Sequence, residues 1–303
     1  MIVAITGGRG FIGSCLVEKH LKENDEVRIL SRENKFRKNK AKVFIGDLAK
    51  NNSNFSDFLN GADVLYHCAG EYNNELLMRK LHIDGTQTLI NASKGKIGRW
   101  IQLSSVGVYG PHRAGIVTEN STINPHGLYE ETKAESEEIV ANSGVPFVIL
   151  RPSNVIGEFM RSQSIFQLIN MIKKGYFVYL GKDSSLANYV HVADVASALM
   201  CCAKSNQSLG KIYNLSQTIS VDEMVSAIMV GLEIDRKFKR IPEFPVRLLV
   251  KLFEKFPGFP LTLSRVDALT TKNQYDSNKI IEELNFEFSS QLQEHFQLLA
   301  KLK

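Results

Sequence analysis

The sequence has few of the features that mark a secreted, membrane-spanning or metal-binding protein. Its 303 residues include only four cysteines, and no two of them form a Cys-x-x-Cys pair. We therefore expect reduced thiols, no disulfide framework and no metal site. No run of about 18 apolar residues occurs, so no spanning helix is expected. The first strand signal starts at Ile2, so we expect no signal peptide and a cytoplasmic location.

An excess of charge of one sign is also missing. The 37 basic and 32 acidic residues leave a net charge of +5, which is too small to argue for a nucleic-acid partner. The apolar share of 44% and the charged share of 23% are those of a globular protein. The length allows one large domain or two smaller ones.

Strand and helix signals alternate up to Pro152. The expected strands are Ile2–Ile5, Val27–Leu30, Val43–Ile45, Asp63–His67, Trp100–Leu103 and Phe147–Leu150, and the expected helices are Phe11–Glu23, Phe55–Leu59, Glu75–Ser93 and Tyr129–Ala141. This alternation predicts an α/β fold, a Rossmann doubly wound parallel sheet with helices on both faces. Ligands of such sheets bind at the carboxyl ends of the strands.

The alternation loosens after Pro152. The expected elements there are helices at Ile165–Lys174 and Val221–Leu232, a strand and helix within Val190–Ala203, and a strand at Ile212–Leu215. We expect residues 1–155 and 186–216 to form the dinucleotide-binding domain. Residues 156–185 and 217–303 are expected to form a smaller C-terminal α/β lobe, with the substrate in the cleft between them.

The stretch Val3–Gly13 runs from a strand signal through a glycine-rich turn into a helix signal. Gly7 permits φ values that a Cβ forbids, Gly10 lets backbone N–H groups approach a pyrophosphate, and Gly13 lets the helix lie close to its strand. The helix N-terminus offers free N–H donors and partial positive charge to an anion. The pattern predicts a dinucleotide site, although any strand–turn–helix unit can carry glycines.

Two further groups carry chemistry. Tyr129 and Lys133 lie four residues apart on an expected helix, so they share a face. An ammonium group near the phenol lowers its pKa from about 10 and fits it for proton transfer to a substrate oxygen. Ser104 and Ser105 end the fifth strand, where a hydroxyl can bond a reacting carbonyl; turn serines are the ordinary alternative.

In this order, the motifs resemble those of the extended short-chain dehydrogenase/reductases, in the NAD-dependent epimerase/dehydratase group. The matching segments are Thr6–Gly13, Gly46–Leu48, Asp84–Thr86, Ser104–Gly110, Tyr129-x-x-x-Lys133, Leu150–Asn154, Tyr189–Val195, Tyr213–Leu215, Tyr275–Lys279 and Glu283–Phe286. The resemblance covers nearly the whole chain. It implies an oxidoreductase or epimerase that acts on a hydroxyl or keto carbon of a small molecule, with a sugar nucleotide as the expected substrate. It also implies a homodimer formed through Glu75–Ser93 and Tyr129–Ala141.

The resemblance also implies roles for single residues. Tyr129 is expected as the catalytic acid/base, Lys133 as its partner and Ser105 as the hydroxyl that orients substrate. Expected cofactor-binding residues are Gly7, Arg9, Gly10, Phe11, Ile12, Gly13, Ser31, Arg32, Asp47, Leu48, Cys68, Ala69, Gly70, Ser104, Pro152 and Asn154. Expected substrate-binding residues are Glu71, Val106 and Asn154.

The end of the second strand departs from the pattern of NAD-using members. Where they carry an acidic residue for the ribose hydroxyls, this chain has Leu30-Ser31-Arg32. A serine and an arginine suit a 2′-phosphate, and Arg9, Lys35 or Arg37 can reach the same place. We favour NADP as the cofactor, with NAD as the alternative.

Other departures bear on the reaction. Dehydratases of the family have an Asp-Glu pair where Val106 and Gly107 stand here, so a dehydratase is not expected. A 4-ketoreductase and a 4-epimerase both need only Ser105, Tyr129 and Lys133, and the NADP-leaning site favours the reductase. Ala187 stands where nucleotide-sugar members carry an arginine. Arg161 or Lys182 can replace it; otherwise the substrate is a non-sugar alcohol or ketone, as in hydroxysteroid- or flavonol-reductase-like relatives.

A non-catalytic NADP-binding regulator is the remaining alternative, and the complete catalytic set argues against it. His82 stands where relatives have asparagine. It is either a proton-relay group or an ordinary helix histidine. His191 is expected to bond backbone at the domain junction.

The segment Pro245–Phe256 has the pattern of a basic amphipathic helix. Arg247, Lys251 and Lys255 recur every four residues among apolar side chains. Such a helix can lie on an anionic membrane surface. We favour the other interpretation, in which the apolar face packs on the protein's own lobe.

Overall fold

A computed structural model describes residues 1–33, 40–50, 55–160, 164–253 and 262–302. Its centre is a seven-stranded sheet in the order β11-β7-β5-β4-β1-β2-β3, in which every neighbouring pair is parallel. The strands are β1 (Ile2–Thr6), β2 (Glu26–Ser31), β3 (Lys42–Ile45), β4 (Ala62–His67), β5 (Ile97–Leu103), β7 (Phe147–Pro152) and β11 (Lys211–Leu215). The predicted Rossmann fold class is confirmed.

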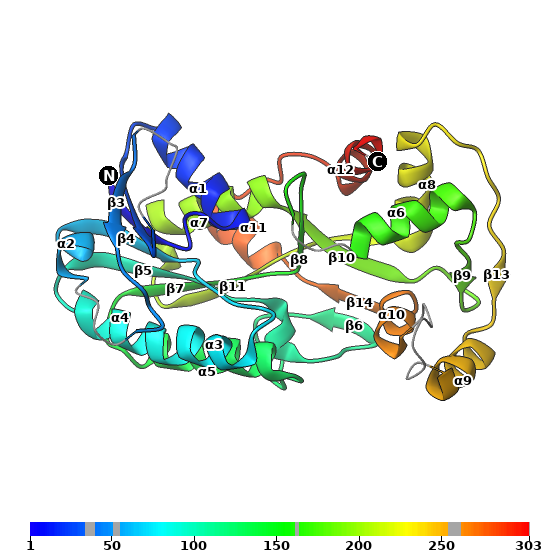
Figure 1. The fold of residues 1–303 in the computed structure, drawn as a ribbon, viewed down its shortest axis with the longest axis horizontal. Coiled ribbons are helices and arrows are strands. Elements are labelled where there is room, and N and C mark those ends of the chain that lie inside the picture. The colour runs from blue at the N-terminus through cyan, green and yellow to red at the C-terminus, as the bar shows by residue number, and fades with distance from the viewer. Residues whose placement is uncertain (34–39, 51–54, 161–163, 254–261, 303) are drawn as a thin grey trace.

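Helices cover both faces of this sheet (Figure 1). On one face lie α1 (Phe11–Lys22), α7 (Val192–Lys204) and α11 (Asn278–Leu284); on the other lie α2 (Ser56–Leu59), α3 (Glu75–Arg79), α4 (Gly85–Ser93) and α5 (Leu128–Ala141). The expected helix Glu75–Ser93 is not α-helical throughout, because Lys80–Asp84 forms a π-helical turn between α3 and α4. Such a turn re-aims the side chains it carries, and His82 is one of them.

The remaining elements gather at the other end of the molecule (Figure 1). A second sheet has the order β12-β10-β8, from β12 (Gln217–Ser220), β10 (Leu186–His191) and β8 (Asn154–Ile156). Three helices enclose a separate apolar cluster beside it: α6 (Ser164–Lys174), α8 (Val221–Gly231) and α12 (Leu292–Lys301). The two-stranded pairs are β9 (Tyr179–Leu180) with β13 (Arg240–Ile241) and β6 (Ala114–Val117) with β14 (Lys272–Tyr275).

A buried ion pair fixes α5 to the sheet. Arg151 on β7 donates to Glu137 on α5 at 2.9 Å, and both side chains are almost fully buried. The guanidinium also donates to the Tyr109 hydroxyl at 2.7 Å, which donates to Asn214 at 2.8 Å. Since Tyr109 belongs to the short 3₁₀ turn η2 (Val106–Tyr109) and Asn214 to β11, one network joins four elements. It sets the position of the helix that carries Tyr129 and Lys133.

The amphipathic segment forms α9 (Glu243–Phe253), which packs near α10 (Leu263–Ala268). The expectation that its apolar face packs on the protein is wrong for most of that face. Val250 is buried, but Leu248 and Leu252 are 52% and 62% exposed. Lys255 and Phe256 lie outside the described residues. Within the described part of the chain, no helix is long and apolar enough to span a bilayer.

The buried pair generates a stability prediction. Glu137→Gln leaves Arg151 buried without its counter-charge, so the free energy of unfolding should fall by about 3 to 5 kcal/mol, measured by urea denaturation. Glu23→Gln breaks the exposed pair with Lys204 (44% and 50% exposed side chains) and is the control. Its loss should stay below about 1 kcal/mol. An equally small loss at Glu137 would contradict this account of how α5 is held.

Candidate functional site

The glycine-rich turn has no room for side chains. Gly7 has φ +68°, and a Cβ there would lie 2.6 Å from the Cys68 carbonyl at the end of β4. A Cβ on Gly13 would lie 2.2 Å from the Gly7 carbonyl oxygen. Gly10 precedes α1 with φ −77°, and its N–H donates to Gly7 at 2.8 Å. The first and last glycines are thus required by geometry, as the sequence predicts. At Gly10 the constraint is milder, since a Cβ there would lie 3.1 Å from the Gly7 carbonyl oxygen.

The N-terminus of α1 is built to receive an anion. Gly10 supplies no side-chain cap, and the first turn carries no acidic residue that would compete for the N–H groups. The backbone donors of Phe11 and Ile12 therefore lie at the positive end of the helix, and within the described part of the chain no side-chain cap bonds them. This arrangement fits the pyrophosphate of a dinucleotide.

Arg9 and Ser31 lie together, as the sequence predicts. The Arg9 guanidinium lies 3.4 Å from the Ser31 hydroxyl and 4.0 Å from the Glu33 carboxylate. Ser31 ends β2, next to β1, so the turn after β1 meets the end of β2. Arg32 is exposed beside this pair, whereas Lys35 and Arg37 lie outside the described residues. The end of β2 thus presents a serine and two arginines, and the Ser31 hydroxyl donates to the Glu33 carbonyl at 2.8 Å.

Tyr129 and Lys133 occupy one side of α5. The Lys133 ammonium is buried and donates to the Leu103 carbonyl at 2.6 Å, which joins α5 to the end of β5. Burial lowers the pKa of Lys133 to about 8. Burial also raises the pKa of Tyr129 to about 12, and the Glu130 carboxylate adds to the increase. The expected lowering of the tyrosine pKa is therefore not seen in the protein alone, because desolvation and the Glu130 carboxylate both raise it.

The two serines after β5 differ in their bonding. Ser105 caps η2, and its oxygen accepts from the Gly107 N–H at 3.1 Å. The hydroxyl hydrogen is then available to a second acceptor. The Ser104 hydroxyl is buried and has no hydrogen-bond partner among the described residues. Both the capping role and a substrate-orienting role are thus open to Ser105 at once.

His82 holds the loop beside Tyr129. Its Nε2 accepts from the Glu71 N–H at 3.0 Å, so the proton lies on Nδ1, which donates to the Thr132 hydroxyl at 2.9 Å. Thr132 in turn donates to the Tyr129 carbonyl at 3.0 Å. Burial lowers the pKa of His82 to about 3. Both nitrogens are occupied in the neutral ring, which favours a positioning role over the proton relay.

Two residues near Tyr129 were missed or undervalued from sequence. The Tyr72 ring lies edge-on to the Tyr129 ring, 5.1 Å between centroids, although Tyr72 is 71% exposed. The Glu130 carboxylate lies beside two glycines: an added Cβ would be 2.8 Å from it at Gly127 and 3.6 Å at Gly107. An i+1 neighbour of a helical tyrosine gives no periodic signal, so Glu130 was not found.

Glu71 is less free than expected of a substrate ligand. One carboxylate oxygen accepts from the Tyr72 and Asn73 N–H groups, each at 2.9 Å. The hydrogen bond from Asn73 is the largest cause that lowers the pKa of Glu71. Val106, the other expected substrate residue, is buried in η2. Glu71 therefore shapes the loop, and its second oxygen alone is left for a ligand.

The other expected cofactor residues line the edge of the sheet in different ways. Burial raises the pKa of the Cys68 thiol to about 12. The Ala69 N–H donates to the Thr6 hydroxyl at 3.2 Å. Gly70 lies against His82, Leu48 and Pro152 are buried, and Asp47 accepts from the Ala49 N–H. Asn154 donates to the Asn188 carbonyl at 3.1 Å, so its amide serves the second sheet. These positions leave the backbone at the strand ends as the main ligand-facing surface.

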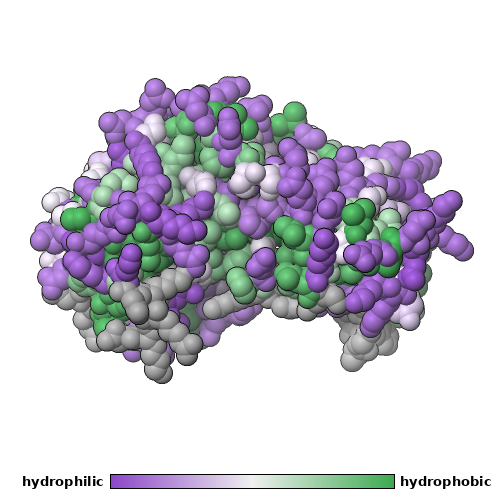
Figure 2. Space-filling view, turned by 90° about the horizontal axis from the view of Figure 1, so that it is seen from above, coloured by the Kyte–Doolittle hydropathy of each residue, from purple (hydrophilic) through white to green (hydrophobic). Residues whose placement is uncertain are grey.

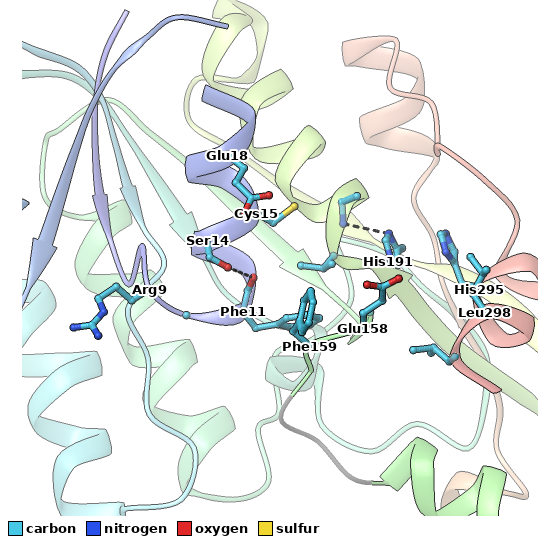
Figure 3. A pocket seen from close by; sticks show the side chains of 15 residues that line it. Arg9, Phe11, Ser14, Cys15, Glu18, Glu158, Phe159, His191, His295 and Leu298 are labelled. Carbon is cyan, nitrogen blue, oxygen red and sulfur yellow. Dashed lines mark hydrogen bonds between the residues drawn. The ribbon is translucent and has the colours of Figure 1, made fainter. Parts of the chain in front are cut away.

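A cavity of about 550 Å³ opens where α1, α7 and α12 meet. Arg9, Gly10 and Phe11 line one end of it, whereas Ser105, Tyr129 and Lys133 do not line it. Figure 3 shows Arg9 pointing away from the other labelled side chains, and His191 beside His295. Their rings stack at 3.9 Å, and His191 accepts from the Ala193 N–H at 3.3 Å. The predicted backbone bond of His191 at this junction is confirmed.

Comparison with known proteins places this geometry in a family. The model of the NAD dependent epimerase/dehydratase family matches residues 3–216. The chain belongs to this family. The expectation of an NAD(P)-dependent enzyme of the extended short-chain dehydrogenase type is thereby confirmed.

The proteins that this chain resembles are described with different activities. A putative UDP-glucose 4-epimerase of Methanocaldococcus jannaschii is 28% identical over 249 residues, which are 75% of this chain and 81% of the relative. The mouse (Mus musculus) sterol-4-alpha-carboxylate 3-dehydrogenase, decarboxylating, is 25% identical over 260 residues, 78% of this chain and 70% of the relative. UDP-glucuronic acid 4-epimerase from Bacillus cereus, solved with NAD, matches with a TM-score of 0.76 at 19% identity, covering 100% and 99% of the two chains.

The environment of His82 predicts a pH dependence of stability. Its pKa is about 3 in the folded protein and near 6.5 when unfolded, so the unfolded state binds the proton first as pH falls. Between about pH 7 and about pH 5, protonation of His82 in the unfolded state should lower the free energy of unfolding by about 2 kcal/mol. His82→Gln keeps an acceptor for Glu71 and a donor for Thr132 but does not titrate.

We therefore expect His82→Gln to lose about 2 kcal/mol less than the wild type over this range, measured by urea denaturation at the two pH values. The same exchange at exposed His126 is the matched control and should keep the wild-type dependence. A His82 variant as steeply pH-dependent as the wild type would show that His82 is not held neutral.

Proposed function

We propose that this protein is an NADP-dependent oxidoreductase that acts on a hydroxyl- or keto-bearing carbon, with Tyr129 as the acid/base. The observation that carries the proposal is the placement of Tyr129 and Lys133 on α5, with Lys133 bonded to Leu103 two residues before Ser105. These groups lie at the carboxyl edge of the same sheet that bears the glycine turn. Either 4-ketoreduction or 4-epimerisation of a nucleotide sugar uses this set, and the reductase is the first choice.

The residues present fit a nicotinamide dinucleotide. The turn from Gly7 to Gly13 and the uncapped start of α1 would hold the pyrophosphate, and Arg9, Ser31 and Arg32 would hold a 2′-phosphate. When bound, the cofactor supplies a hydride acceptor or donor and a positive charge in its oxidised form. That charge would act against the desolvation that raises the pKa of Tyr129.

The chain's own groups then divide the work. Ser105 directs its free hydroxyl hydrogen to the substrate oxygen, since its own oxygen already accepts from Gly107. Tyr129 gives a proton to that oxygen on reduction or takes it on oxidation. Lys133, fixed by Leu103, keeps a positive charge close to the phenolate. A dehydratase is disfavoured because Val106 and Gly107 have no proton to transfer.

A non-sugar ketone is a second candidate for the substrate. Ala187 is a buried apolar side chain on β10, so this strand position offers no cation to a diphosphate. Lys182 is exposed, and Arg161 lies outside the described residues. The sterol dehydrogenase relative supports this alternative, and the putative UDP-glucose 4-epimerase supports the sugar.

We also propose a two-part division of the chain in which residues 156–185 and 217–303 form most of the substrate lobe. Two elements cross the predicted boundaries: β10 pairs within the second sheet, and α11 packs on the main sheet. The separate apolar cluster under α6, α8 and α12 supports the division. A homodimer through α3, α4 and α5 and a cytoplasmic location follow from the family resemblance and complete the proposal. A non-catalytic role is disfavoured by the intact Ser105, Tyr129 and Lys133.

Removal of one hydroxyl tests the mechanism. Tyr129→Phe should lower turnover by about 10² or more, because no other side chain replaces the proton donor. Turnover is measured as NADPH consumption with a 4-keto nucleotide sugar or a ketosteroid, and as sugar-nucleotide conversion without added cofactor. NADPH binding should change by no more than about twofold. Tyr72→Phe, which alters the neighbouring ring, is the control and should stay active; a fully active Tyr129→Phe would refute the mechanism.

Cofactor choice is tested by titration. The wild type should bind NADPH more tightly than NADH, and Arg32→Gln should weaken NADPH binding by about tenfold or more while sparing NADH. Lys42→Gln on β3, where Lys42 pairs with Glu26, is the matched control. Quenching of intrinsic fluorescence gives both constants. Tighter binding of NADH by the wild type would overturn the NADP assignment.

A further inference from the structure

The helix α9 turns its apolar side away from the protein. Val250 is buried and Val246 is half-buried against the lobe, in a cluster with Leu180 and Val266. Five larger apolar side chains of the same helix face solvent: Phe244 (79% exposed), Leu248 (52%), Leu249 (52%), Leu252 (62%) and Phe253 (41%). At 100° per residue these five span about half of the helix circumference. An ordinary surface helix shows the reverse orientation.

The position of α9 makes the apolar side accessible. Figure 1 shows the helix at one end of the long axis, far from the helices α3, α4 and α5 that are expected to form a dimer. The face seen in Figure 2 is different in character, since hydrophilic residues cover most of it and hydrophobic ones form separate groups. The apolar arc of α9 therefore differs from this face of the protein, which is mostly hydrophilic.

Charges surround the apolar arc with a positive balance. Arg247 forms ion pairs with Glu243 and Asp267, and Arg113 also pairs with Asp267 at 2.9 Å. Lys251 on α9 is exposed, and Arg265 on α10 is exposed and donates to Gln167. Among the described residues of this face, Lys251 adds a cation to the paired Arg113, Arg247, Glu243 and Asp267, and this positive excess favours an anionic partner.

We propose that α9 docks the protein on the surface of an anionic phospholipid bilayer. The helix is about 16 Å long, too short to span, and would lie in the interface plane with its apolar arc among the acyl chains. Lys251 would meet lipid headgroups at its flank. The arc offers a few hundred Å², roughly, which is below the about 800 Å² that each partner buries in a stable protein complex. A deformable lipid surface accepts such a convex half-cylinder without a matching groove.

Vesicle co-sedimentation of the full chain tests this proposal. The wild type should bind vesicles of phosphatidylcholine mixed with phosphatidylglycerol, and bind more weakly to pure phosphatidylcholine or at high salt. The double variant Leu248→Gln/Leu252→Gln should reduce binding to the mixed vesicles by about tenfold or more. Its thermal unfolding and its NADPH binding should match the wild type, because both leucines lie outside the cofactor and proton-transfer residues.

A matched double variant controls for lost hydrophobicity elsewhere. Leu209→Gln/Leu302→Gln changes two leucines that are 39% and 52% exposed on other elements, and it should bind vesicles as the wild type does. Absence of wild-type binding, or equal binding by the α9 variant, would overturn the proposal. A wild-type dimer that the α9 variant converts to monomers, measured by light scattering, would also overturn it and assign the face to a second copy of this chain.

Discussion

The buried pair of Glu137 and Arg151 is the interaction on which the rest of the site depends. Removal of two charges from water is costly, and the cost is met only where geometry and further hydrogen bonds are complete. Here the guanidinium also donates to the Tyr109 hydroxyl, which in turn donates to Asn214. The pair lies one helical turn beyond Lys133 on α5, so it fixes the rotation of the helix about its axis. A helix held by apolar contacts alone would be free to slide by a fraction of a turn.

This rotation decides the electrostatics of the site. With α5 fixed, the Lys133 ammonium meets the Leu103 carbonyl and Tyr129 lies between the His82 and Tyr72 rings. The phenol is therefore desolvated, which raises its pKa to about 12. A group buried in this way holds its proton firmly until a positive charge enters beside it. If Tyr129 acts as proposed, its readiness to transfer a proton therefore depends on a positive charge bound beside it.

Periodicity and spacing in the sequence predicted the sheet and the meeting of Arg9 with Ser31, because neighbouring parallel strands end at one edge. They did not predict β6 and β14, since four-residue strands with glycine or polar residues carry little periodic signal. The amphipathic pattern located α9 but not its orientation. The pattern shows that one side of the helix is apolar, but only the packing of the rest of the lobe determines whether that side faces the protein or the solvent. The raised pKa of Tyr129 depends on three-dimensional burial, and spacing along a helix cannot report it.

The last helix of the described chain has a consequence for how the protein is made. All seven strands of the main sheet are present once residue 215 has left the ribosome, whereas α12 begins only at Leu292 and emerges later. Until then the inner face of α8, with Val225 and Ile228, lacks the helix that covers it. During that interval the nascent chain combines a finished Rossmann sheet with an open apolar surface. Chaperones that bind exposed hydrophobic segments would meet the second lobe first.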